Sequence, residues 1–286
     1  MDGVWDVHVH PAFFEPLCGD PEVLAFRRRV LGLPKTGIAP LEHVFHQMDC
    51  GGIRRLVLLP LDLTIREGRP VVTNEEIRSL VDRAPGRFVG FASVDPRRPD
   101  REEVLERAFG NLGLAGLKLH PSRQGFDPGD PSLDRIYQIC RSHRRPILFH
   151  AGLSWEPETR MEDAHPLRFE AVAARYPDLN ICLAHFGWPW VRETAALMLK
   201  YPNVYADTGL LYFDSAREFY DRVFRRELDL TWVDRSLRHQ VLFGSDNPRF
   251  EQLRMVRALE GLGLRESTLR LVLEENARVF LGEEGP

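Results

Sequence analysis

Residues 4–11 read VWDVHVHP, an apolar run that contains one aspartate and two histidines and ends at a proline. Its length and its valines are typical of a strand that is buried on both faces. Side chains alternate along a strand, so His8 and His10, two residues apart, are expected on the same side. The run therefore predicts a buried strand that presents two imidazoles together at its carboxyl end.

Seven more short apolar runs follow at intervals of about 25 to 50 residues. They lie at residues 55–59, 88–94, 114–119, 146–149, 181–184, 204–206 and 241–243. Segments with helix signals separate the runs, among them 41–50, which precedes Gly51, and 251–262 and 266–280, which have a 3.6-residue period. Asn74 is expected to cap another helix that starts at Glu75. The pattern is strand then helix, repeated eight times.

Apolar strands that alternate with helices predict a parallel sheet that is covered on both faces. A doubly wound sheet and a closed barrel both fit. Eight units without a glycine-rich phosphate fingerprint after the first strand favour the barrel, which commonly takes about 250 residues. We predict an α/β fold, a (β/α)8 TIM barrel forming one domain over residues 1–286. Long loops after strands one and seven, residues 11–40 and 210–234, are expected to cover the site.

Composition makes several partners and compartments unexpected. Lys and Arg number 38 against 42 Asp and Glu, so nothing in the net charge of -4 favours nucleic acid or an anionic membrane. The chain has neither a signal-peptide pattern nor an apolar run of about 20 residues, and we expect a cytoplasmic protein. The cysteines lack CxxC spacing and are expected to be reduced and mostly buried. They are Cys18, Cys50, Cys140 and Cys182.

Five of the eight predicted strand ends carry imidazole, amine or carboxylate groups, and barrel enzymes build their active sites at these ends. The four residues His8, His10, His150 and Asp246 would bring three nitrogens and one oxygen together. This set suits Zn²⁺ or a similar divalent ion with room for water. Such an ion lowers the pKa of bound water to about 7. His185 would then be free to move a proton or polarise a carbonyl.

Six motifs carry a family resemblance, in the order DVHVHP (6–11), GLKLHP (116–121), LFHAG (148–152), LAHFGWPW (183–190), VYADTG (204–209) and LFGSDNPRF (242–250), before a terminal EENARVFLG. They resemble the amidohydrolase superfamily, in particular the amidohydrolase-related branch that contains aminocarboxymuconate semialdehyde decarboxylase. The resemblance spans residues 6–281. It implies one divalent metal on His8, His10, His150 and Asp246, with His185 as the catalytic acid or base. Members are often dimers, so a homodimer is compatible with it.

Lys118 leaves the number of metal ions open. Some branches of the superfamily carry a carbamylated lysine at the end of strand four, where it bridges two ions. Lys118 lies there, and its side chain faces the same way as that of His120. In the other interpretation Lys118 is an ammonium that binds a substrate carboxylate. We favour one ion, because this branch usually lacks the bridging lysine.

Four residues are candidates for contacts to a small-molecule substrate: Lys118, His120, Arg249 and Trp188. Trp188 belongs to a group of aromatic residues after strands six and seven, with Trp190, Tyr212 and Phe213, that either line a pocket or simply pack. The arginines 27–29 in the first long loop are either an anion site or a solvated charged face.

The main functional hypothesis is a metal-dependent hydrolase that attacks a small lactone, amide or ester with metal-activated water, while Asp246 and His185 handle the proton. The alternative is a non-oxidative decarboxylase of an aromatic or unsaturated carboxylic acid, in which the ion and His185 serve protonation at carbon. A third reading is a barrel that binds metal and ligand without turnover. The presence of both His185 and Asp246 argues against it.

Overall fold

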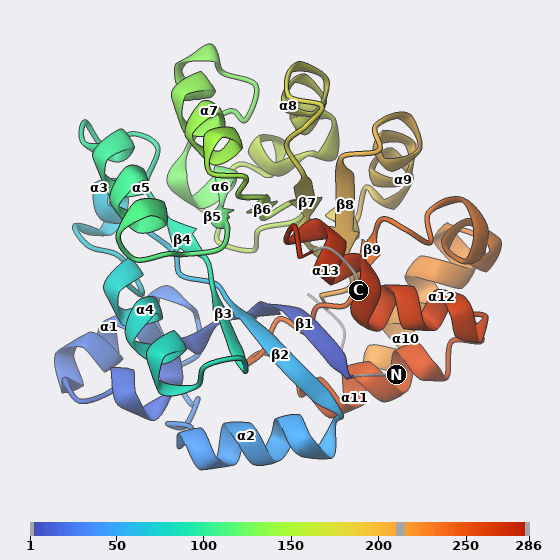
Figure 1. Cartoon of the computed structure of the whole chain (residues 1–286), viewed down its shortest axis with the longest axis horizontal. Helices are drawn as coiled ribbons and strands as arrows, with labels where there is room; N and C mark the ends of the chain where they lie inside the picture. Colours follow the sequence, from blue (N-terminus) through green and yellow to red (C-terminus); the bar gives the residue numbers. More distant parts are fainter. Residues whose placement is uncertain (1–2, 210–214, 284–286) are drawn as a thin grey trace.

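The computed structural model describes residues 3–209 and 215–283 and contains the predicted alternation of strands and helices (Figure 1). All strand pairs are parallel, and β3 and β4 are two parts of the single run predicted at 88–94. The strands are β1 (Val4–Val9), β2 (Ile53–Leu58), β3 (Phe88–Gly90), β4 (Ala92–Ser93), β5 (Leu117–Leu119), β6 (Ile147–Phe149), β7 (Ile181–Leu183), β8 (Val204–Asp207) and β9 (Val241–Leu242).

The barrel closes where the first strand meets the last. The Val7 amide donates a hydrogen bond to the Phe243 carbonyl at 2.9 Å, and Val9 forms a parallel bridge with Asn247. Between β3 and β4 the Phe91 amide donates to the Leu58 carbonyl at 3.0 Å and keeps the third strand in place. The predicted (β/α)8 barrel is confirmed. The extent of a single domain over residues 1–286 stays a prediction.

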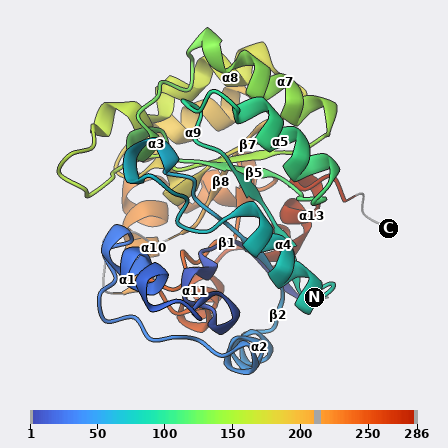
Figure 2. The ribbon, with the colours of Figure 1, turned by 90° about the vertical axis from the view of Figure 1, so that its left-hand side faces the viewer.

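Helices surround the strands (Figure 1), and Figure 2 shows α1 and α3 toward one end of the barrel and α13 toward the other. The α-helices are α1 (Pro21–Val30), α2 (Leu41–Cys50), α3 (Thr64–Glu67), α4 (Asn74–Arg83), α5 (Arg101–Gly110), α6 (Pro121–Gln124), α7 (Asp134–Ser142), α8 (Glu170–Arg175), α9 (Val191–Lys200), α10 (Ala216–Asp221), α11 (Gln252–Glu260), α12 (Glu266–Arg270) and α13 (Asn276–Phe280). The π-helical segments are η7 (Arg222–Glu227), η8 (Trp232–Ser236) and η9 (Leu271–Glu275). No helix among the described residues is long and apolar enough to cross a membrane.

The predicted helices are present, and one cap is corrected. α2 ends at Cys50, before Gly51, and α12, η9 and α13 together cover the predicted segment 266–280. The cap of α4 is Thr73 and not Asn74, because Thr73 Oγ1 accepts from the Glu76 amide at 3.1 Å and Glu76 Oε2 accepts from the Thr73 amide at 2.8 Å. The Asn74 side chain instead pairs with the Ser93 backbone.

The two long connections contain helices. Residues 11–40 form the short 3-10 segments η1 (Pro11–Phe13) and η2 (Glu15–Leu17) and the helix α1, and residues 215–234 form α10, η7 and the start of η8. Tyr212 and Phe213 lie outside the described residues. All four cysteines are free, but only Cys140 and Cys182 are buried, while Cys50 is exposed on α2 and Cys18 is half-buried. The expectation that the thiols are mostly buried therefore holds for two of them.

A bulge in β1 turns the two histidines toward the site. Trp5 and Val7 belong to the apolar cluster inside the barrel, which also includes Val57, Phe91, Leu148, Cys182, Tyr205 and Leu242. Asp6 pairs with Leu56 and Val9 with Leu58, so β1 carries one extra residue between these pairs. The extra residue shifts the alternation, and His8 lines the pocket although Val7 also faces inward.

Gly116 makes room for a core ring. Gly116 directly precedes β5. A Cβ atom at this residue would overlap the ring of Phe91, which is fully buried inside the barrel. We expect Gly116→Ala to lower the free energy of unfolding by about 1–3 kcal/mol, as measured by urea denaturation, because the Phe91 ring must leave its position. Gly37→Ala is the control, since nothing lies within 4 Å of a Cβ at that exposed position. Equal stability of the two variants would contradict this role of Gly116.

Candidate metal centre and pocket

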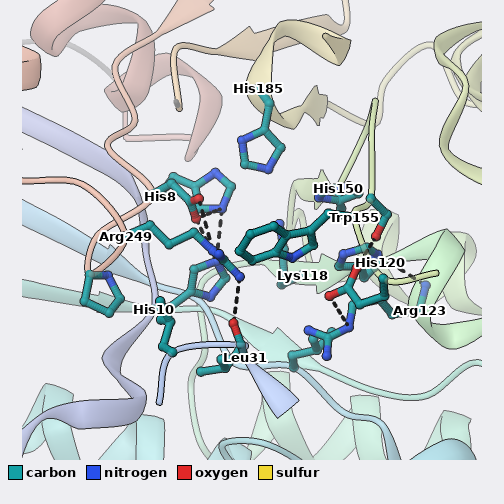
Figure 3. A pocket seen from close by; sticks show the side chains of 16 residues that line it. His8, His10, Leu31, Lys118, His120, Arg123, His150, Trp155, His185 and Arg249 are labelled. Atoms are coloured by element: carbon teal, nitrogen blue, oxygen red, sulfur yellow. Dashed lines mark hydrogen bonds and ion pairs between the residues drawn. The ribbon is translucent and has the colours of Figure 1, made fainter. Parts of the chain in front are cut away.

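Eight of the nine predicted site residues line one pocket at the carboxyl ends of the strands (Figure 3). The pocket encloses about 60 Å³. Its lining consists of His8, His10, Leu31, Leu33, Leu61, Lys118, His120, Arg123, His150, Ser154, Trp155, Glu156, His185, Asp246, Pro248 and Arg249. Trp188 is the exception. Its ring packs toward Phe219 of α10, with 6.5 Å between ring centroids, and does not line the pocket.

His8, His10 and Asp246 converge as a metal-binding set would. His8 Nε2 and His10 Nε2 are 3.2 Å apart, and Asp246 Oδ1 lies 3.6 Å from the first and 3.3 Å from the second. Two ligands that each lie about 2.0–2.1 Å from a tetrahedral zinc ion are about 3.3–3.4 Å from one another. The spacing of the three atoms therefore fits a divalent ion between them.

His150 lines the same pocket but lies outside the convergent set of His8, His10 and Asp246. Its Nε2 is buried and has no hydrogen-bond partner among the described residues, an arrangement that costs free energy unless another group binds the nitrogen. The imidazole stacks on that of His120, with 3.8 Å between centroids and an angle of 11° between the rings. His150 Nε2 could thus serve as a fourth ligand, as predicted.

Asp207 was missed by the sequence analysis, although the motif VYADTG contains it. Its Oδ2 accepts a hydrogen bond from His8 Nδ1 at 2.8 Å. This bond places the His8 proton on Nδ1 and leaves the lone pair of Nε2 free for a metal. Asp207 Oδ1 also accepts from the amides of His185 and Gly209, at 2.8 and 2.9 Å. Asp207 could have been found in the sequence, because it is a carboxylate at the end of a predicted strand. The same criterion, a polar group at a strand end, identified the other candidate site residues.

Burial keeps three of the pocket imidazoles neutral. It lowers the pKa of His8, His150 and His185 well below the usual range, and the positive charge of nearby Lys118 lowers each of them further. Neutral imidazole is the form that binds metal ions. Burial alone would raise the pKa of Asp246, but the hydrogen bond from His10 and the charges around it outweigh burial and lower the pKa. Asp246 is therefore a carboxylate.

Two pocket residues have left-handed backbone conformations. The φ angles are 59° at His185 and 60° at Asp246, values that cost free energy for residues other than glycine. Hydrogen bonds hold both residues there: the Asp246 amide donates to the His8 carbonyl at 2.9 Å, and the His185 amide donates to Asp207. Strained backbone of this kind is frequent at functional sites.

Lys118 lies deep in the pocket with only 2% of its surface exposed. Within the described part of the chain its ammonium has no hydrogen bond or ion pair, although the carboxylates of Asp207 and Asp246 act on it over longer distances. Burial lowers the pKa of Lys118 to about 8, and these two carboxylates limit the shift. The arrangement provides a buried cation for an incoming anion.

The outer wall of the pocket comes from three loops. Arg249 Nη2 donates to the Leu31 carbonyl at 2.8 Å, its Nε lies 3.8 Å from Asp246 Oδ2, and its guanidinium stacks on the Trp155 ring at 4.3 Å (Figure 3). Arg123 forms an ion pair with Glu156 at 3.3 Å. Arg249 was predicted from the sequence, whereas Trp155, Arg123 and Glu156 were not, since no local pattern separates them from other loop residues.

The arginine triplet 27–29 does not reach the pocket. Arg27 is buried and donates to the Val71 carbonyl and to Glu76, at 2.8 and 2.6 Å. Arg28 donates to the Thr36 carbonyl and Arg29 to Glu67. The triplet thus stabilises the loop and is not a substrate anchor.

The contact between Asp207 and His8 yields a test of the metal centre. We expect Asp207→Asn to weaken divalent metal binding by about 10- to 100-fold, because an amide no longer polarises His8 or holds its proton on Nδ1. Affinity is measured by competition with a chromophoric chelator, and circular dichroism checks the fold. Glu42→Gln, on exposed α2, is a control that changes a carboxylate to an amide far from the pocket. Metal affinity within twofold of wild type would contradict the role of Asp207.

Two curated proteins are similar to parts of the chain. One is the 2-amino-3-carboxymuconate-6-semialdehyde decarboxylase of Dictyostelium discoideum, 26% identical over 130 residues, which are 40% of this chain and 36% of the relative. The other is Protein fluG of Emericella nidulans, 28% identical over 86 residues, 30% of this chain and 10% of the relative. The similarity thus spans about a third of the length of the decarboxylase and about a tenth of the length of Protein fluG.

Solved structures resemble the chain over nearly its whole length. A TIM-barrel protein from Bordetella bronchiseptica, described as uncharacterized, has a TM-score of 0.76 at 19% identity and covers 98% of both chains. A putative 2-pyrone-4,6-dicarboxylic acid hydrolase from Pseudomonas putida has a TM-score of 0.69 at 18% identity over 100% of both. A dihydroxybenzoic acid decarboxylase from Polaromonas, with bound manganese, has 0.67 at 15% identity over 99% of this chain and 97% of its own. These likenesses show the fold.

The family is shown by the sequence itself. The model of the amidohydrolase family matches residues 48–282, well over half of the chain, and this range includes Lys118, His120, His150, His185 and Asp246. His8 and His10 precede the matched range but converge with Asp246 in the structure. The chain therefore belongs to the amidohydrolase family, a family of enzymes built on the TIM barrel.

Proposed function

We propose that the chain is a metal-dependent, non-oxidative decarboxylase of an aromatic or unsaturated carboxylic acid. The observation that carries the proposal is the buried, unneutralised ammonium of Lys118 beside the candidate metal ligands. A carboxylate is the complementary substrate group, and Arg249 adds a second cation at the outer wall. Decarboxylases among the similar proteins support this choice over hydrolysis, which the sequence alone had favoured.

For the cofactor we propose one divalent ion held by His8, His10, His150 and Asp246. The three nitrogens and one oxygen favour Zn²⁺, while the manganese in the Polaromonas enzyme makes Mn²⁺ the other candidate. When bound, the ion supplies a positive charge that stabilises negative charge developing on the substrate. His8, His185 and Asp207 form a second group of potential ligands. A single ion is consistent with this group, because His8 Nδ1 already donates to Asp207. Lys118 then stays an ammonium and carries no carbamate.

The residues of the chain account for the chemical step. Lys118 and Arg249 bind and orient the carboxylate, and the anion stabilises the protonated form of the neighbouring His185. The bond between the carboxylate and its carbon breaks, CO₂ leaves, and the electron pair stays on that carbon. His185 delivers its proton there and returns to the neutral form that burial favours.

Hydrolysis of a lactone, amide or ester is the second candidate. One observation favours it: neutral His185 and ionised Asp246 face the same pocket, and both can take a proton from water. The overall likeness to the putative hydrolase from Pseudomonas putida agrees with it.

We further propose that the chain binds a small-molecule substrate and that its sole other partner is a second copy of itself in a homodimer. We also propose a cytoplasmic location, which is consistent with the four unpaired cysteines.

The two reactions give different products. Metal-loaded protein is incubated separately with a panel of carboxylated aromatics and a panel of lactones. We expect it to release CO₂ from at least one of the carboxylated aromatics. We expect no acid to be formed from the lactones. His185→Asn should lower the rate at least about 100-fold while metal content stays unchanged, because it removes the proton donor. Acid release from a lactone would favour hydrolysis. No turnover of either class would favour a binding protein.

Lys118 predicts a specific pH dependence of ligand binding. Burial lowers the pKa of Lys118 to about 8. The side chain is therefore an ammonium below pH 8 and loses its charge above it. The affinity for benzoate, measured by calorimetry, should be highest below pH 8 and fall by up to about tenfold per pH unit above it. In Lys118→Met the affinity should be lower and independent of pH over the same interval. A wild-type affinity that does not change around pH 8 would contradict a role for this ammonium in binding.

A further inference from the structure

Trp155 lies on the rim of the pocket with 51% of its surface exposed. Its ring is in front of Lys118 in Figure 3, between Arg249 and the pair formed by His120 and His150. Trp155 lines this pocket and also a neighbouring cavity, as do Arg123 and Glu156. A large aromatic side chain with half of its surface uncovered beside a binding pocket is available for contact with a ligand.

The residues on either side of Trp155 are held in place. Ser154 Oγ donates to Glu156 Oε2 at 2.7 Å, and Glu156 Oε1 lies 3.3 Å from Arg123 Nε. Arg123 is itself buried and donates to the Val30 carbonyl at 2.5 Å. The position of the Trp155 backbone is therefore defined although its side chain is exposed, and the ring can be oriented before a ligand arrives.

The inner face of the pocket is aromatic as well. His120 and His150 are buried, nearly parallel rings 3.8 Å apart. On the outer side Trp155 stacks on the Arg249 guanidinium at 4.3 Å, which the Leu31 carbonyl also binds. A flat, conjugated ring gains stacking free energy from such faces, whereas a puckered saturated ring gains little.

We propose that Trp155 is a specificity-determining residue, which selects flat, conjugated carboxylates by stacking on them while Arg249 binds the carboxylate. This inference rests on the proposed function in taking the ligand to be a carboxylic acid. It adds that the flat shape of the acid is recognised and that Trp155 is the residue that recognises it. Arg249 has further N–H donors beyond the one used by Leu31, so that it can stack on Trp155 and bind an anion together.

The test compares benzoate with cyclohexanecarboxylate, two monoanions of similar size that differ in flatness. Dissociation constants are measured by calorimetry on the metal-loaded protein and require no turnover. Wild type is expected to bind benzoate more tightly. Trp155→Leu should weaken benzoate binding by about 5- to 30-fold and change cyclohexanecarboxylate binding by less than about twofold, because only the flat ring loses a stacking partner. Trp155→Phe should keep most of the preference.

Trp232→Leu is the matched control. Trp232 is exposed to a similar extent, at 42%, but does not line the pocket, so this variant should bind both acids as wild type does. Equal losses for the two acids in Trp155→Leu, no loss for either, or no binding of either acid to wild type would overturn the proposal. A protein that prefers benzoate through Trp155 but releases no CO₂ refutes the proposed reaction alone. Decarboxylation without this preference refutes the role of Trp155 alone.

Discussion

A buried carboxylate, Asp6, joins the first strand to the last, and the candidate metal centre depends on this connection. Asp6 Oδ1 accepts from the amides of His8 and Ser245, at 3.2 and 2.9 Å. Its Oδ2 accepts from Ser245 Oγ and from Gln252 Nε2 of α11, both at 2.6 Å. Burial raises the pKa of Asp6 to about 6, although these hydrogen bonds favour the charged form. They bring His8 and Asp246, from opposite ends of the chain, to the same place.

The chemistry of the pocket follows from removing water around a particular set of charges. Burial makes the imidazoles of His8, His150 and His185 neutral, the form that binds metal ions, and it leaves Lys118 as a cation without a close counterion. Asp207 has a double role, since one oxygen sets the proton position on His8 and the other holds the backbone of His185. A candidate metal ligand and the proposed proton donor are thus oriented by the same carboxylate.

Much of the fold and of the site was predictable, because both depend on local periodicity. Apolar runs of strand length located all the strands, and the two-residue spacing of His8 and His10 placed both imidazoles together, as their 3.2 Å separation confirms. The prediction for Trp188 did not hold because its direction depends on packing against α10, which no local pattern specifies. The cap at Thr73 was predictable, since Thr73 and Glu76 have the spacing of a capping box, and was overlooked.

The sequence by itself determined the order of strands and helices and the polar residues at the strand ends, since these depend on contacts between near neighbours along the chain. Only the tertiary structure decided the bulge that turns His8 inward, the contact of Asp207 with His8, and the stacking of Trp155 on Arg249. Each of these joins segments that are far apart in the sequence or depends on the register of two strands. Such contacts form only when the barrel closes, because closure alone brings their partners within bonding distance.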